Sequence, residues 1–365
     1  MTKMSAHPQT PEEVVAIRLL SSSTSPTVWE FESCAPLPNV FQGRTFGGSS
    51  MALAVHAAYH TLGNTIDQLR LYSVMGNFLS PQEAYKIVRI RVTSLRSTRT
   101  FATRQVIISQ KSKKNEKEWQ DTFVALIDFI AQKGVNDKEK KERNIISFSA
   151  QPPINRITHH SKLQDLDVYL KNELDRGVVP KWAYDAYQPS FHLLDAWHNR
   201  YCPEGVFEQI KLGCSMHLQS DQIHLPMADR RSWDWAKYRK PLPIQNSTTS
   251  DKLLPPTKTA SSAILFCHYL DTWSSMTIPW MVGVDWPQIE ACATLDFAFR
   301  FHVDELDATQ WHLRQNKANA ANDQRNYVEL QLWREREGKD FELVITLTEL
   351  CILRGLKQKK QNGNL

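Results

Sequence analysis

A polar pair inside an apolar strand is the most suggestive chemical feature of the sequence. Residues 291–303 read ACATLDFAFRFHV, in which Thr294 and Asp296 interrupt the pattern of a buried strand. Burying a hydroxyl or carboxylate costs free energy unless a hydrogen bond compensates it. We therefore interpret the strand as crossing a reaction site that Thr294 faces; a Thr294 that merely packs is the alternative. Because strand side chains alternate with a period of two, Asp296 is expected on the same face, as a structural residue at the site's edge.

Other patterns that could carry catalysis are incomplete. Gly47-Gly48-Ser49 begins like a nucleophile elbow but lacks the closing glycine, which argues against an α/β-hydrolase. His56 and His60 are four residues apart, but no Glu follows His56 as a zincin requires, so structural histidines are expected. The six cysteines form no CxxC pair and are expected to be reduced core thiols. We predict neither a metal nor a cofactor.

Composition indicates an ordinary globular protein. The 365 residues suffice for two domains, and 41% are hydrophobic and 23% charged. The net charge of +5 suits a phosphorylated small molecule but does not indicate nucleic acid. Aromatic and basic residues mix in 181–192 and 230–243, yet no nucleic-acid motif accompanies them.

No secretory h-region or membrane-length apolar run is present. A cytoplasmic protein is expected; peroxisomal import is the alternative, although QNGNL is not an SKL-type signal.

The order of elements predicts an α+β protein built from two similar halves. An Ala-rich helix at 49–62 precedes strands at 69–79, 85–93, 100–109 and 118–130. A helix at 263–270 precedes strands at 290–303, 310–315, 326–335 and 341–353. Small residues on most faces of the first helix predict that a sheet wraps it. A short helix is also predicted within 11–20.

These elements give five segments. They are a lead at 1–37, a first domain at 38–132, an insertion and linker at 133–260, a second domain at 261–356, and a polar tail at 357–365. The charge run 138–143 is expected to be solvated. The insertion is expected to cover the groove between the domains.

Four motifs, in this order, carry a resemblance to a known family. The first motif is Phe46-Gly47-Gly48 before the Ala-rich helix, and the last is Thr294-Leu295-Asp296 followed by Phe301-His302. Between them lie NFLSP at 77–81 and LRSTRTFATRQV at 95–106. With these motifs the chain resembles the type II acyl-CoA thioesterases, which are tandem (double) hotdog proteins with a curled antiparallel sheet around a central helix in each half.

The resemblance implies a set of site residues. In the family an Asp that begins the second hotdog helix, a Thr or Ser on the next strand and a Gln near the end of the last strand bind the attacking water. These positions fall on Asp271, Thr294 and Glu349. Such chemistry needs a proton acceptor, a held water and a donor facing the oxyanion, which a backbone N–H at a helix start could supply. The substrate-binding residues that the resemblance implies are Gly47, Gly48, Phe78, Arg104 and Trp273.

The chain departs from the family pattern where the chemistry is most sensitive. Glu349 replaces an amide that both donates and accepts, whereas an ionised carboxylate only accepts. Asp271 and Glu349 are therefore expected to titrate as a pair that retains one proton. Thr98 stands where Gly is usual and Met75 where His is common, and 272–286 is unusually aromatic. These changes predict a diverged acyl substrate.

The resulting hypothesis is hydrolysis of an acyl-CoA or acyl-carrier thioester, within a dedicated biosynthetic pathway, by a water that Asp271, Thr294 and Glu349 activate. Coenzyme A enters only as part of the substrate. One alternative is acyl transfer, cyclisation or isomerisation on a rebuilt hotdog site. Another is a non-catalytic acyl-binding protein. A homo-oligomer is also compatible with the sequence.

Overall fold

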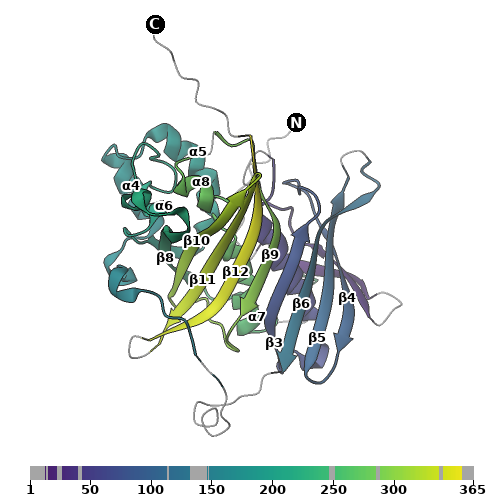
Figure 1. Ribbon diagram of the computed structural model, residues 1–365. Coiled ribbons are helices and arrows are strands. Elements are labelled where there is room, and N and C mark those ends of the chain that lie inside the picture. Colours follow the sequence, from purple (N-terminus) through teal and green to yellow (C-terminus); the bar gives the residue numbers. More distant parts are fainter. Residues whose placement is uncertain are drawn as a thin grey trace.

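One antiparallel sheet organises the chain in this computed structural model (Figure 1). Its twelve strands follow the order β1-β2-β4-β5-β6-β3-β9-β12-β11-β10-β8-β7. The halves join where β3 pairs with β9, from Ser73 opposite Arg300 to Asn77 opposite Asp296. The structure describes residues 13, 15–22, 27–39, 43–112, 115–131, 146, 148–245, 251–284, 288–336 and 340–355.

Each half has the order of two strands, one long helix and four strands. The first half comprises β1 (Ile17–Ser22), β2 (Val28–Ser33), α2 (Gly47–His60), β3 (Leu69–Phe78), β4 (Arg89–Ser97), β5 (Phe101–Lys111) and β6 (Trp119–Ala131). The second comprises β7 (Trp197–Tyr201), β8 (Arg231–Tyr238), α7 (Lys258–Leu270), β9 (Ala291–Phe301), β10 (His312–Asn322), β11 (Arg325–Glu335) and β12 (Phe341–Arg354). Since the two strand orders mirror each other about the β3–β9 junction, the α+β prediction with two similar halves is confirmed.

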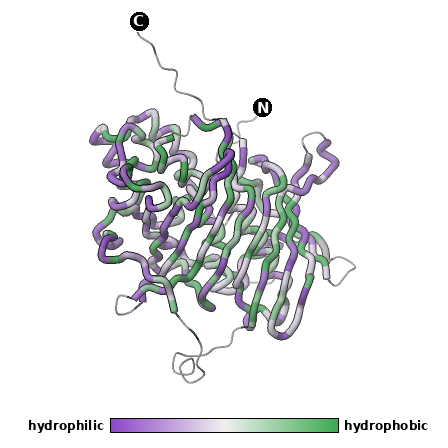
Figure 2. The backbone as a smooth tube through the Cα atoms, in the orientation of Figure 1, coloured by the Kyte–Doolittle hydropathy of each residue, from purple (hydrophilic) through white to green (hydrophobic). Residues whose placement is uncertain are grey.

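The two long helices pack against each other beside the sheet (Figure 1). Every residue from Gly48 to Tyr59 in α2, and from Ala260 to Leu270 in α7, is buried. A helix with apolar residues all round must be covered on all sides, as the Ala-rich sequence of α2 predicted. In Figure 2 hydrophobic and hydrophilic residues alternate along the strands, so one face of the sheet meets the helices.

Four strands lie outside the domains drawn from the sequence. The predicted helix within 11–20 is wrong for its second half, because Ile17–Ser22 pairs with β2 as a strand. β1 and β2 thus extend the first half into the supposed lead. β7 and β8, within the supposed insertion, pair with each other and with β10. The pairings of β2 with β4 and of β8 with β10 join segments distant in sequence, which local patterns do not reveal.

The helices of the inserted segment lie beside the second half. They are α4 (Leu166–Asp175), α5 (Lys181–Phe191) and α6 (Val206–Gln209), grouped near β8 rather than over the β3–β9 junction (Figure 1). The end of the same segment also contacts the first half, where Leu253 pairs with Ile17 and the Leu254 carbonyl oxygen lies 3.0 Å from Nε2 of His60, so coverage of the groove between the domains stays a prediction. The charge run 138–143 and the tail 357–365 lie outside the described residues. None of the helices in the described ranges has the length and apolarity needed to cross a membrane.

Candidate active site

A β-bulge in β9 decides which side chains face the helices. Asp296 lies opposite Leu350 and Thr294 opposite Cys351, so Leu295 has no partner in the ladder. The extra residue reverses the alternation, and Thr294 therefore faces the same side as the buried Phe297. Asp296 faces the other side with Leu350. The prediction that Asp296 shares the face of Thr294 is wrong because of this bulge.

The bulge brings Thr294 between two carboxyl groups. Its Oγ1 lies 3.4 Å from Oδ1 of Asp271 and 3.4 Å from Oε2 of Glu349. Glu349 is completely buried and Asp271 is 6% exposed. The three residues implied by the family resemblance thus meet at one place, from α7, β9 and β12. Asp271 lies at the C-terminal end of α7, however, and not at the start of a helix as expected.

The N-terminus of α2 holds Asp271 in place. The Gly48 N–H donates to Oδ2 of Asp271 over 2.7 Å, across the boundary between the halves. The N-cap residue of α2 makes no side-chain bond and its first turn has no acidic residue, so Asp271 supplies the negative charge favoured there. Ser274 Oγ lies 3.4 Å from Oδ1 of the same carboxyl group. The Gly48 N–H is therefore engaged by Asp271, although the sequence suggested that it could face a substrate oxygen.

The two carboxyl groups favour a protonated state. Burial raises the pKa of Glu349 well above its usual range, and the charge of Asp271 raises it further. Burial also raises the pKa of Asp271, which a hydrogen bond with Glu349 and then those from Gly48, Ser274 and Thr294 partly oppose. Oε1 of Glu349 is buried without a hydrogen-bond partner among the described residues. Because two adjacent buried carboxylates repel, the pair retains a proton, and it belongs on Glu349.

Cys351 is a member of the site that the sequence reasoning missed. Its sulfur lies 3.7 Å from Oε2 of Glu349. Burial raises the pKa of the Cys351 thiol, which keeps the sulfur protonated and able to donate weakly to the carboxyl group. Its position two residues after Glu349 on one strand was the available signal, since such residues share a face.

Both glycines at the start of α2 are required by close packing. A Cβ atom on Gly47 would lie 2.9 Å from Oδ2 of Asp271 and 3.1 Å from the Phe78 ring. A Cβ atom on Gly48 would lie 2.5 Å from the carbonyl oxygen of His268. Phe78 itself packs against Phe123, with ring centroids 5.2 Å apart. Gly47, Gly48 and Phe78 thus adjoin the site.

We expect Gly48→Ala to destabilise the protein by about 1–3 kcal/mol, the usual cost of overpacking. The methyl group would push α2 away from α7 and lengthen the bond from the Gly48 N–H to Asp271. Urea unfolding followed by circular dichroism measures the loss. Equal stability of Gly48→Ala and the parent would contradict the packing argument.

Arg104 lies at the opposite end of α2 from Asp271, Thr294 and Glu349. It is only 3% exposed, and its guanidinium donates to Thr61 Oγ1 at 2.7 Å and to the Arg96 carbonyl at 2.8 Å. Thr61 is the C-cap of α2, so Arg104 satisfies polar groups where the helix ends. The structure does not bring Arg104 together with the three site residues, and its role in substrate binding stays a prediction.

Trp273 lies on the turn that follows Asp271. Its φ of +66° is unusual for a bulky side chain. The indole is buried against Trp280, at a centroid distance of 5.3 Å, and against Phe191 of the inserted segment at 6.0 Å. The aromatic residues of this region therefore pack on one another behind the site, which gives Trp273 a supporting position.

Arg314 of β10 fixes the turn that carries Asp271. Its guanidinium donates to the Thr272 carbonyl at 3.1 Å and to the Tyr269 carbonyl at 3.5 Å. The fully buried Arg314 also forms an ion pair with the fully buried Asp234, at 2.9 Å. Asp234 in turn accepts hydrogen bonds from the Tyr269 hydroxyl at 2.5 Å and Asn199 at 2.9 Å. The network joins β7, β8 and β10 to the residues on both sides of Asp271.

Comparisons with known proteins agree with this architecture. Residues 36–130 match the family model of the acyl-CoA thioesterase N-terminal domain, and residues 216–339 match that of the C-terminal domain. The second range includes Asp271 and Thr294 but ends before Glu349. No curated protein matches the chain.

Solved thioesterase structures resemble the whole chain. The tesB protein of Mycobacterium avium subsp. paratuberculosis is 14% identical, with a TM-score of 0.57, over 92% of this chain and 95% of that one. A putative thioesterase II from Thermobifida fusca is 12% identical, with a TM-score of 0.59, over 95% and 99%. TesB2, an acyl-CoA thioesterase II from Mycobacterium marinum, is 15% identical, with a TM-score of 0.54, over 95% and 98%. With both domain models matched in order and the tandem fold shared, the chain belongs to the acyl-CoA thioesterase family of double hotdog proteins.

Proposed function

We propose that the protein hydrolyses an acyl-CoA or acyl-carrier thioester at Asp271, Thr294 and Glu349. The observation that carries this proposal is the position of Thr294 Oγ1, 3.4 Å from a carboxyl oxygen of each neighbour. This arrangement can hold a water between the Thr294 hydroxyl and the Asp271 carboxylate, which would act as the base. The family membership supplies the class of substrate.

The roles follow from the protonation states. Thr294 orients the water, and Asp271 accepts its proton as the oxygen attacks the thioester carbonyl. Protonated Glu349 donates a hydrogen bond, as an amide would, and can stabilise negative charge on the carbonyl oxygen. Collapse of the tetrahedral intermediate expels the thiolate, which leaves as a thiol after protonation, and the acyl group leaves as a carboxylic acid. No covalent enzyme intermediate is needed.

The direct test is release of free thiol from a panel of acyl-CoAs and acyl-pantetheines. Panel members should include short, long, branched and aromatic acyl groups, because Glu349, Thr98 and Met75 depart from the family pattern and support a diverged acyl substrate, as a dedicated pathway would use. Saturable thiol release is expected for a subset of the panel. If no member is cleaved by the folded protein while acyl-CoA still binds, the hydrolase proposal fails in favour of an acyl-binding protein.

We expect Glu349→Gln to remove the alkaline fall of the pH–rate profile. The parent rate should rise as the pair loses its first proton, and fall as Glu349 loses the proton it retains, because its folded pKa is raised. Gln donates at every pH, so only the rise should remain. For the same reason the parent should lose stability as pH rises from the ordinary carboxyl range toward the folded pKa of Glu349, and the variant should lose less.

Glu342→Gln is the matched control, since Glu342 lies on the same strand but pairs with Arg334 at 2.6 Å. Its pH–rate profile should match the parent's. If the parent is inactive and Glu349→Gln creates hydrolysis, the native site performs a different reaction. If Glu349→Gln keeps the alkaline fall, the assigned proton is wrong.

A further inference from the structure

We propose that His159, His160 and Glu335 form a binding site for a divalent transition-metal ion of the Zn²⁺ class. One ligand atom from each residue lies within 4.8 Å of the others. Nε2 of His159 is 3.4 Å from Oε2 of Glu335, the last residue of β11. Two imidazoles and one carboxylate are a common protein ligand set for zinc, with water as the fourth ligand.

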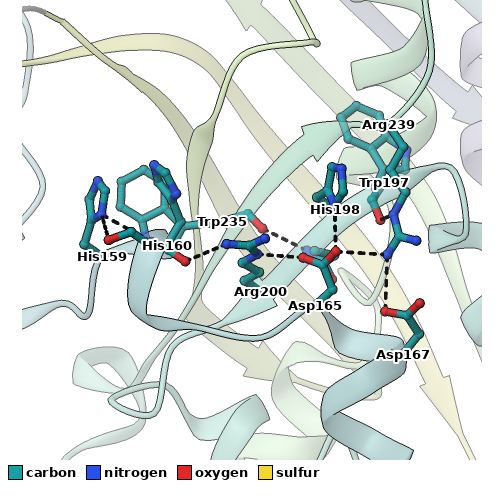
Figure 3. Close-up of polar contacts among 11 residues, drawn as sticks. His159, His160, Asp165, Asp167, Trp197, His198, Arg200, Trp235 and Arg239 are labelled. Carbon is teal, nitrogen blue, oxygen red and sulfur yellow. Dashed lines mark hydrogen bonds and ion pairs between the residues drawn. The ribbon is translucent and has the colours of Figure 1, made fainter.

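The backbone of the two histidines is fixed before any ion binds. The Thr158 carbonyl accepts a hydrogen bond of 3.0 Å from the Trp235 indole N–H, and the His160 carbonyl accepts one of 2.8 Å from Arg200. Arg200 is held in turn by Asp165 at 2.6 Å. Figure 3 shows these groups side by side, with both imidazoles next to Trp235. A ligand pair that is already ordered loses little entropy on binding.

The orientation of each imidazole ring leaves one of its nitrogens available to an ion. His160 is stacked on Trp311, with centroids 4.4 Å apart and planes 15° apart, and its ring nitrogens make no hydrogen bond among the described residues. Nδ1 of His159 is 2.8 Å from Ser161 Oγ. The Ser161 N–H also donates to this nitrogen at 3.3 Å, so an ion bound through Nε2 would exchange that bond for one from Nδ1–H to the Ser161 hydroxyl, the outer contact typical of metal-bound histidine.

The charges around the site also allow a cation. Arg200 is paired with Asp165 at 2.6 Å, and the same carboxyl group also contacts His198 and Arg239. The two arginines that flank Glu335 in sequence, Arg334 and Arg336, both pair with Glu342. The Glu335 carboxylate therefore remains available for the ion.

A bound ion would connect two distant parts of the second half. The histidines precede α4 in the inserted segment, whereas Glu335 ends β11, 175 residues after His160. Since such a link exists only in the folded chain, an ion bound there should raise the thermal midpoint of unfolding. The sequence could not indicate this site because its third ligand is remote.

Calorimetric titration of the full-length, EDTA-treated protein with ZnCl₂ tests the proposal. We expect one ion per chain with a Kd in the micromolar range, and a Kd at least tenfold higher for His160→Ala and for Glu335→Gln. Glu335→Gln is expected to fold normally, because Glu335 lies at a strand end and is 35% exposed. A raised Kd in this variant therefore reports the loss of a ligand rather than misfolding. His192→Ala is the matched control, since this exposed histidine pairs with Asp195 elsewhere, and its Kd should equal the parent's.

A second readout locates the ion. Cu²⁺ should quench part of the tryptophan fluorescence, and Trp311→Phe should reduce that quenched part because Trp311 lies against His160. Absence of saturable Zn²⁺ binding below 1 mM would overturn the proposal. So would a Kd that Glu335→Gln and His160→Ala leave unchanged, since the ion would then bind elsewhere.

Discussion

Replacing Asp271 with Asn should lower kcat for thioester hydrolysis by about 10²–10⁴-fold, the usual contribution of a general base. The amide cannot take the proton of the attacking water, although its oxygen can still accept the Gly48 N–H that lies 2.7 Å from the native carboxyl group. The structural bond therefore survives while the base is lost. Because Asp271 acts on the water rather than on the acyl chain, KM should change less than kcat. Thiol release at saturating substrate measures the effect.

The matched control for this experiment lies on β9. Asp296→Asn makes the same chemical change two residues from Thr294, but the bulge turns Asp296 to the other face of the sheet. Its kcat should stay within about twofold of the parent's, the range expected for a surface change. If Asp296→Asn impairs hydrolysis as much as Asp271→Asn, the assignment of faces is wrong. If Asp271→Asn is fully active and folded, Asp271 is not the base.

The central elements could be predicted because their signals are local. The Ala-rich run before Leu62 and the alternating strands that follow have periods that fix helix and strand. The ends of β9 and β12 agree with the expected ranges within one or two residues. Asp271, Thr294 and Glu349 could be named from motifs alone, yet only the fold shows that they meet. Their catalytic roles stay predictions.

The errors have a common physical origin. A one-residue bulge is invisible in the letters TLD, but it reverses the face of every later residue in the strand and so misplaces Asp296. β1 and β7 are short strands at the two edges of the sheet, and they join it only through β2 and β8, whose other partners β4 and β10 lie far along the chain, so their sequences carried too little signal.

Replacing Arg314 with Met should reduce the free energy of unfolding by about 3–5 kcal/mol, the usual cost of removing one partner of a buried ion pair. Asp234 would remain buried with an uncompensated charge, and the carbonyl groups of Tyr269 and Thr272 would lose their donor. Urea unfolding measures the loss. Arg325→Met is the control, because Arg325 is an exposed arginine paired with the exposed Asp323, and should cost at most about 1 kcal/mol.

Arg314→Lys separates the ion pair from the positioning of the Asp271 turn. A lysine keeps a charge opposite Asp234 and should recover much of the stability. A compact ammonium lacks the guanidinium fork that reaches Asp234 and the Thr272 carbonyl together, so the turn should loosen. We therefore expect Arg314→Lys to have a lower kcat than the parent under conditions in which urea unfolding shows that the variant is fully folded. Parent-like kcat with reduced stability would mean that Arg314 supports the core without positioning Asp271. A parent-like stability of Arg314→Met would contradict the buried ion pair itself.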